Sequence, residues 1–154
     1  MVSGSSRLPA RSTPARRRGD ESVAHLPSID EAFLASARLD FEPAVIESGM
    51  TCIVFPSWPL PAGLSQASAD LLVRLPGGYP DAAPDMWWFS PAITAADGRV
   101  IQATEYSELH VGRTWQRWSR HFNPGQWQSG IDGLENYLAL IRAETERAAK
   151  PVNS

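Results

Sequence analysis

The feature that most constrains this fold is a proline-rich segment between two apolar runs, VRLPGGYPDAAPDMWWFSP at residues 73–91. Pro76, Pro80 and Pro84 recur at intervals of four residues within it. Proline fixes φ at about −65° and has no N–H to donate, and it biases the preceding residue toward extended backbone. The spacing therefore predicts one rigid, non-repeating connection between two strands.

Apolar runs on both sides of this connection are typical of strands. In SADLLVRLP, the residues Leu71, Val73 and Leu75 occupy alternate positions, which predicts a half-buried strand. The segment DMWWFS predicts the next strand. AVIES and TCIVFPSWPLP precede them, and the three prolines of the latter predict an edge position or an abrupt end. The short links between these runs predict an antiparallel meander of three to four strands.

Helical patterns flank the strands. Ser28 and Glu31 have the spacing of a capping box, and the apolar residues after them predict a helix over about 29–38. A longer C-terminal helix follows Asp132 as its expected cap, with one apolar face formed by Leu134, Tyr137, Leu138, Ile141 and Ala148.

The order of these patterns defines a fold class. Between the strands and the last helix, the weakly patterned residues 92–112 and the Trp-rich residues 113–127 predict an irregular segment. We therefore expect an α+β domain over residues 28–150, with its sheet covered on one side.

Composition narrows the class of protein. The 154 residues are 43% apolar and 20% charged, as in soluble globular proteins, and no apolar run approaches the roughly 20 residues that span a bilayer. Cys52 is the only cysteine, which excludes an internal disulfide and fits a reducing compartment, so we expect a cytoplasmic protein. One cysteine and three scattered histidines lack ligand spacing, so neither a metal nor another cofactor is expected.

Charge is distributed unevenly along the chain. Five of the 14 basic residues lie within residues 1–19, which contain no acid, leaving nine basic against 17 acidic residues elsewhere. We expect residues 1–22, rich in Ser, Pro, Gly and Arg, to be a disordered tail. The acidic remainder argues against a nucleic-acid-binding fold.

The proline-rich segment resembles the ubiquitin-conjugating (E2) superfamily. In that superfamily a strand ends in a proline, followed by Tyr-Pro, by a second proline five residues after the tyrosine, and by another strand. Pro76, Tyr79, Pro80 and Pro84 match these positions. Trp127, in WQSGIDGL, stands at the tryptophan of the Trp-Ser-Pro step that precedes the next helix of conjugating enzymes.

The resemblance covers about residues 41–149 and is strongest toward the bacterial branch called prokaryotic E2 family E. It implies a UBC-like fold and a role in a bacterial ubiquitin-like pathway. The implied partners are an E1-like activating enzyme, a ubiquitin-like modifier and a JAB-type metallopeptidase that removes the modifier. No membrane partner is expected.

The catalytic positions of the superfamily are altered in this chain. Conjugating enzymes carry their cysteine eight residues before the tryptophan, and that position here is Ser119. Their His-Pro-Asn turn lies about ten residues before the cysteine. His110 lies nine residues before Ser119, without an adjacent proline or asparagine. The resemblance therefore implies an acyl carrier without the usual nucleophile.

Two hypotheses follow from this substitution. Ser119 could accept the modifier as an oxyester if a base activates it. His121 or His110 would then act as the base or stabilise the oxyanion, and Asn123 is a candidate oxyanion donor. Cys52 is an alternative nucleophile, although a lone cysteine in an apolar strand is typically a buried apolar residue. The other hypothesis is a non-catalytic interaction module, like the ubiquitin E2 variants that lack the cysteine.

A third, weaker hypothesis comes from residues 113–127. Interleaved aromatic and basic side chains can bind nucleic acid by stacking and phosphate contact. The structural interpretation is that the tryptophans anchor the segment while the arginines lie over them. The residues concerned are Trp115, Trp118, Trp127, Arg113, Arg117 and Arg120.

Overall fold

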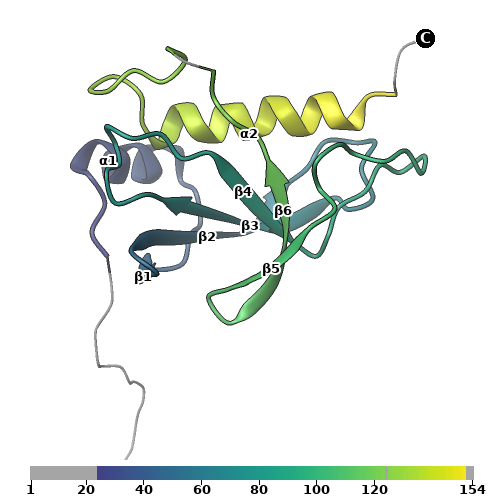
Figure 1. Cartoon of the computed structure of the whole chain (residues 1–154), viewed down its shortest axis with the longest axis horizontal. Coiled ribbons are helices and arrows are strands. Elements are labelled where there is room, and N and C mark those ends of the chain that lie inside the picture. The colour runs from purple at the N-terminus through teal and green to yellow at the C-terminus, as the bar shows by residue number, and fades with distance from the viewer. Residues whose placement is uncertain (1–23, 124, 152–154) are drawn as a thin grey trace, which may run out of the picture.

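Two helices and six strands form the part of the chain that the computed structural model describes, residues 24–123 and 125–151 (Figure 1). In chain order they are α1 (Ser28–Ala37), β1 (Val45–Glu47), β2 (Met50–Pro59), β3 (Ser68–Leu75), β4 (Met86–Ser90), β5 (Ser107–His110), β6 (Arg113–Ser119) and α2 (Leu134–Ala149). The predicted α+β class is confirmed. The tail expected at residues 1–22 lies outside the described residues.

All strands form one antiparallel sheet in the order β1-β2-β3-β4-β6-β5. The prediction of three to four strands was too low, and the segment expected to be irregular contains strands β5 and β6. The strand pattern was hidden because both faces of β6 are buried. Trp115 and Trp118 point to opposite faces, and Gln116 is buried while exchanging two hydrogen bonds with the backbone of Ile93.

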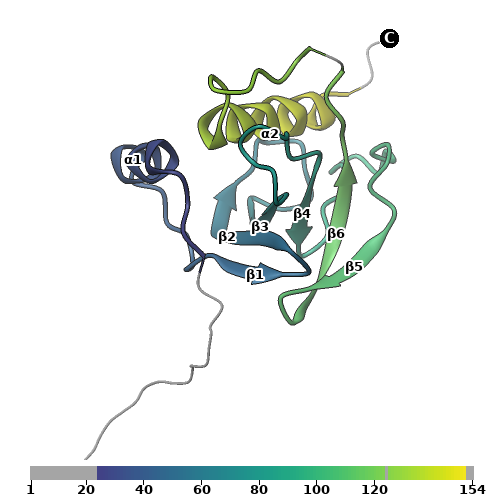
Figure 2. The ribbon, with the colours of Figure 1, turned by 60° about the vertical axis from the view of Figure 1, so that its left-hand side comes forward.

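The sheet curls, and its two faces differ (Figures 1 and 2). Helix α2 lies across one face and closes the main core, which contains Phe55, Leu71, Trp87 and Trp118. On the opposite face the edge strands β1 and β5 approach each other. Between them lies a smaller apolar cluster, the second cluster, formed by Cys52, Val54, Leu72, Trp88 and Trp115.

The proline-rich connection is hydrogen-bonded to α1 and to the segment that precedes α2. The hydroxyl of Tyr79 donates to Oδ2 of the buried Asp30 in α1 at 2.6 Å, and Oδ1 of Asp30 accepts the N–H of Leu134 at 3.1 Å. The indole N–H of Trp127 donates to the carbonyl of Pro80 at 2.8 Å. This sequence motif therefore holds α1, the connection and the start of α2 together.

The predicted helix caps were wrong. Pro27, not Ser28, precedes α1, and no side chain caps that helix. The carboxylate of Asp132 accepts the N–H of Gln128 in the preceding turn, at 2.7 Å, while Asp30 takes the first N–H of α2. Gly133 permits this approach, because a Cβ there would lie 2.9 Å from Oδ1 of Asp30. The cap comes from a residue 104 positions away, so local sequence carried no sign of it.

Within the described residues, no helix is both long and apolar enough to cross a membrane.

Candidate functional site

Ser119 ends strand β6 beside Met86 of β4. Its backbone N–H donates to the carbonyl of Ala103 at 3.1 Å. Its hydroxyl oxygen accepts a hydrogen bond from Nε of Arg117 at 3.1 Å, and the same guanidinium donates to Glu108 at 2.7 Å. The half-buried Ser119 hydroxyl is therefore paired with a cation, which can stabilise negative charge on oxygen but cannot remove its proton.

A groove of about 610 Å³ runs past Ser119 between residues 99–103 and the C-terminal half of α2. Arg120 crosses it: Nε contacts Glu144 of α2 at 3.0 Å, and another guanidinium nitrogen donates to the carbonyl of Gln102 at 3.1 Å. The groove is lined by Arg99, Val100, Ile101, Gln102, Ala103, Ser119, Arg120, His121, Glu144, Arg147 and Ala148.

The two candidate histidines lie in different places. His121 follows Ser119 and also lines the groove, but its Nδ1 lies 3.3 Å from Asp85, and both side chains are largely exposed. His110 pairs with Arg113, at the opposite end of β6 from Ser119. Six residues of extended strand separate these ends by about 20 Å. His110, a candidate base, is therefore kept away from Ser119 by the pairing of β5 with β6.

Asn123 is engaged through its backbone. Its N–H donates to the side chain of Gln126, and its carbonyl accepts the N–H of Gln126 at 3.0 Å. Among the described residues, no hydrogen bond connects the Asn123 side chain to Ser119. The assignment of Asn123 as an oxyanion donor stays a prediction.

Cys52 is buried in the second cluster, 2% exposed. Burial raises the pKa of its thiol, although Nε of Arg74 donates to the sulfur at 3.5 Å and partly opposes that shift. The thiolate is the reactive form of cysteine. Cys52 is therefore a poor nucleophile in this fold.

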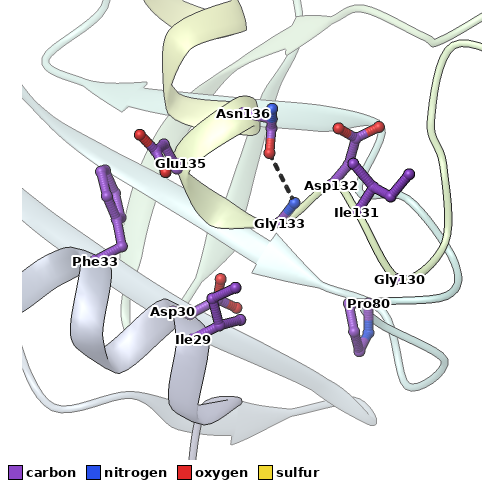
Figure 3. A pocket seen from close by; sticks show the side chains of 10 residues that line it. All are labelled: Ile29, Asp30, Phe33, Pro80, Gly130, Ile131, Asp132, Gly133, Glu135 and Asn136. Atoms are coloured by element: carbon purple, nitrogen blue, oxygen red, sulfur yellow. Dashed lines mark hydrogen bonds between the residues drawn. The ribbon is translucent and has the colours of Figure 1, made fainter.

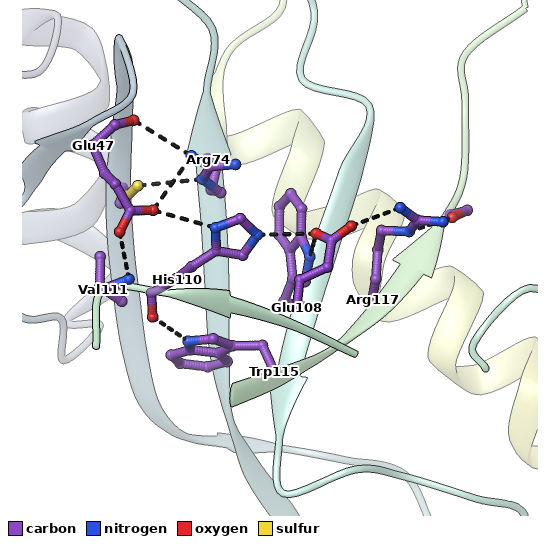
Figure 4. Close-up of polar contacts among 10 residues, drawn as sticks. Glu47, Arg74, Glu108, His110, Val111, Trp115 and Arg117 are labelled. Atoms are coloured by element: carbon purple, nitrogen blue, oxygen red, sulfur yellow. Dashed lines mark hydrogen bonds and ion pairs between the residues drawn. The ribbon is translucent and has the colours of Figure 1, made fainter. Parts of the chain in front are cut away.

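A chain of polar contacts that the sequence did not predict connects Cys52 to Ser119 across the open face of the sheet. Its central members, from Glu47 and Arg74 to Arg117, are shown in Figure 4. From Cys52 it runs through Arg74, Glu47, His110, Glu108 and Arg117 to the Ser119 hydroxyl. We call these five intermediate residues the polar chain. They cover the second cluster, where Arg74 and His110 lie against the ring of Trp88.

The two glutamates of the polar chain are held ionised. Burial alone would raise the pKa of Glu47, but hydrogen bonds from the Val111 N–H and His110 and the charge of Arg74 outweigh it, so the pKa is lowered. For Glu108, burial is likewise outweighed by His110, the indole of Trp88 and Arg117, and its pKa is also lowered. Both carboxylates therefore act as hydrogen-bond acceptors near neutral pH.

One sequence signal could have revealed part of the polar chain. Glu108 and His110 are two residues apart and would share a face if residues 107–110 had been recognised as a strand. Glu47 and Arg74 approach them only through the curl of the sheet. Within the described residues, no group of three or more His, Cys, Asp or Glu side chains could hold a metal ion.

The predicted structural role of the Trp-rich segment is confirmed except for Arg117, which lies over Tyr106 and not over a tryptophan. The rings of Trp115 and Trp118 are fully buried, with the guanidinium carbons of Arg113 and Arg120 4.4 and 5.2 Å from their centres. Trp127 packs against Tyr79, with a centroid separation of 6.2 Å. Trp115 and Trp118 therefore have no free face on which a base could stack, which removes the main support for the nucleic-acid hypothesis.

A second hollow, of about 180 Å³, lies between α1 and the start of α2 (Figure 3). Ile29 and Phe33 line it from α1, Pro80 lines it from the proline-rich connection, and residues 130–133 close it. Ile29 and Ile131 are 72% and 70% exposed. This surface presents apolar side chains beside a cavity, as partner-binding surfaces do.

The N-terminal helix, the antiparallel meander, the rigid Tyr-Pro connection and the C-terminal helix define a protein of the ubiquitin-conjugating, or UBC-like, class. Residues 26–148 match the family described as prokaryotic E2 family E, and the chain belongs to this family. Membership indicates a role in prokaryotic ubiquitin-like conjugation. Comparisons with curated proteins and with solved structures found no match.

Proposed function

We propose that this protein is the E2-like component of a bacterial ubiquitin-like conjugation pathway, working in the cytoplasm between an E1-like activating enzyme and a ubiquitin-like modifier. The observation that carries the proposal is the family match over residues 26–148. A JAB-type peptidase that removes the modifier would complete the pathway. The groove beside Ser119 would hold the modifier's tail, and the hollow at Ile29 and Ile131 would contact a partner protein.

The geometry supports non-covalent presentation of the modifier better than covalent transfer. The Ser119 hydroxyl contacts Arg117, not a base, and the nearest histidine in sequence, His121, is paired with Asp85. Cys52 is buried under Arg74. In this mode the domain binds the modifier in the groove and positions it for a partner enzyme.

One observation favours an oxyester on Ser119 as a second candidate. Arg117 lies where its Nε–H would stabilise negative charge developing on the Ser119 oxygen. In that reaction the Ser119 oxygen would attack the thioester carbonyl of the modifier held by the activating enzyme. The C–O bond forms, the C–S bond breaks, and the hydroxyl proton leaves to a base, for which His121 is the candidate.

Mass spectrometry of the protein incubated with its activating enzyme, modifier and ATP distinguishes these modes. We expect no adduct, together with binding of the modifier that a substitution in the groove, Arg147→Glu, weakens by about tenfold. An adduct that resists thiols, is cleaved by alkali and is lost in Ser119→Ala would contradict non-covalent presentation and support the oxyester on Ser119. An adduct that reductant removes and Cys52→Ala abolishes would contradict both. Absence of adduct and of binding would overturn the proposed function.

A further inference from the structure

His110 is held between carboxylates from two different strands. Its Nδ1 lies 3.2 Å from Oε1 of Glu47, and its Nε2 lies 2.9 Å from Oε1 of Glu108. The side chain is only 13% exposed, and its ring packs edge-on against Trp88 with a centroid separation of 5.2 Å. The ring therefore has little freedom to turn away from either carboxylate (Figure 4).

Hydrogen-bond chemistry determines which form of His110 satisfies this site. An ionised carboxylate only accepts hydrogen bonds, so each ring nitrogen must donate one. The imidazolium has two N–H groups, whereas either tautomer of the neutral ring has one. Loss of a proton therefore leaves a nitrogen lone pair facing the oxygen of Glu47 or of Glu108, and that contact becomes repulsive.

The contact bridges strands that the sheet does not pair. Glu47 ends β1 and His110 ends β5, and these strands are the two edges of the sheet. The other bond at this point, from the N–H of Val111 to Oε2 of Glu47 at 2.7 Å, does not depend on the charge of His110. His110 and Glu47 are thus the two ionisable groups of the link that closes the curl over the second cluster.

Each strand packed around His110 contributes identifiable polar groups. Besides Glu47 of β1 and Glu108 of β5, Cys52 of β2, Arg74 of β3 and Arg117 of β6 belong to the same chain of contacts. Arg113 of β6, opposite His110, pairs with Asp70 of β3 at 3.0 Å. Arginine stays charged throughout, and burial raises the pKa of the Cys52 thiol. Of the side-chain types in this group, histidine is the one whose ordinary pKa lies near neutral pH.

We propose that His110 is a proton-dependent clasp between the edge strands of the sheet. The charged ring joins β1 to β5 and keeps the second cluster covered. Loss of the Nδ1 proton ends the hydrogen bond to Glu47 of β1, so the β5–β6 hairpin moves away from β1 and solvent reaches Trp88 and Cys52. Arg117 shares Glu108 with His110. Opening would therefore also loosen the arginine that contacts Ser119, a consequence that matters only if the proposed function holds.

The clasp is tested by NMR on the full chain with ¹⁵N-labelled histidine, without any pathway partner. We expect both ring nitrogens of His110 to carry protons at pH 5. With rising pH, loss of one proton should coincide with a shift of the Trp88 indole N–H, which donates to Glu108. Glu47→Gln keeps an acceptor oxygen but removes the charge, and should lower the midpoint of the His110 titration by about one pH unit.

His121 and Asp85 provide the matched control. They form a similar contact at 3.3 Å, but their side chains are 60% and 59% exposed. Asp85→Asn should therefore shift the His121 titration by no more than about 0.3 pH unit, because solvent screens the pair. His110→Gln should abolish the pH dependence of the Trp88 signal.

Three results would overturn the clasp. One is a singly protonated His110 ring at pH 5. Another is a Trp88 signal whose titration has no relation to the His110 midpoint. The third is a folded Glu47→Gln protein with an unchanged His110 midpoint. If Glu47→Gln does not fold, the two measurements on the unsubstituted protein still decide the question.

Discussion

The face of the sheet under α2 and the face that α2 leaves open both bury leucines and tryptophans, but they are closed by different interactions. Under α2, Leu134, Tyr137, Leu138 and Ile141 supply a continuous apolar cover. On the open face, the second cluster is covered by the polar chain. Apolar packing is insensitive to pH, whereas a cover of ion pairs depends on protonation and salt.

The difference shows how a thin sheet domain can bury both of its faces with one long helix. Arginine and histidine present flat apolar surfaces to aromatic rings while their polar edges contact carboxylates. Arg74 does this over Trp88 and Arg113 does it over Trp115, whereas His110 packs edge-on against Trp88. The open face thus combines a buried apolar cluster with a cover of charged and ionisable side chains.

The largest expected effect compares adjacent leucines of β3. Leu71 lies under α2 and Leu72 lies in the second cluster, and both are fully buried. Buried Leu→Ala substitutions cost about 2–5 kcal/mol, depending on how far neighbours collapse into the cavity. In urea unfolding, the loss of stability should lie near the upper end of this range for Leu71→Ala. It should lie near the lower end for Leu72→Ala, because the side chains over Leu72 can move into the cavity. Equal losses would mean that both faces are equally rigid.

The next largest effect concerns Asp30. Asp30→Ala leaves the Tyr79 hydroxyl and the first N–H of α2 without their acceptor. We expect a loss of about 3 kcal/mol in the free energy of unfolding, and a smaller loss for Asp30→Asn, which keeps one acceptor oxygen. Glu31→Ala, at the exposed neighbouring position, should change stability by no more than about 0.5 kcal/mol. A similar loss for Asp30→Ala and Glu31→Ala would show that this buried carboxylate is dispensable.

Acid should weaken the open face first. The pKa values of Glu47 and Glu108 are lower in the folded protein than the ordinary value of 4.5. Their stabilisation is therefore complete above that value and is lost as the pH falls through the lowered, folded-state values. Chemical denaturation between pH 5 and 2 should show a shallower loss of stability for the double variant Glu47→Gln, Glu108→Gln. Asp97→Asn is the control, because the Asp97 carboxyl pairs with Arg99 at an exposed site. If Asp97→Asn makes the loss of stability with falling pH equally shallow, the acid sensitivity is not specific to the open face.

Ser119→Ala should have the smallest effect. The substitution removes one hydrogen bond from Arg117, whose guanidinium keeps its contact with Glu108. Thermal unfolding should reveal a change of no more than about 0.5 kcal/mol in stability. Because the expected change in stability is small, Ser119→Ala can be used to test whether Ser119 binds or carries the modifier. A loss above about 2 kcal/mol would instead make Ser119 a structural part of the open face.

Local sequence determined the features whose causes are local. The spacing of Pro76, Pro80 and Pro84 constrains the backbone by itself, and the apolar face of α2 is a helical repeat. Both were predictable, as were the strands at 68–75 and 86–90. Strand β6 was missed because burial of both its faces removes the alternation by which a strand is recognised.

The tertiary structure alone decided which polar groups meet. Asp30 lies 49 residues from Tyr79 and 104 from Leu134, and Glu47 lies 63 residues from His110. No periodicity spans such separations, so these partners are set by the curl of the sheet and the docking of the helices. The resemblance to conjugating enzymes singled out Ser119, eight residues before Trp127. Only the fold revealed that the Ser119 hydroxyl contacts Arg117. It also revealed that His110 lies beside the other end of β6 and contacts Glu47.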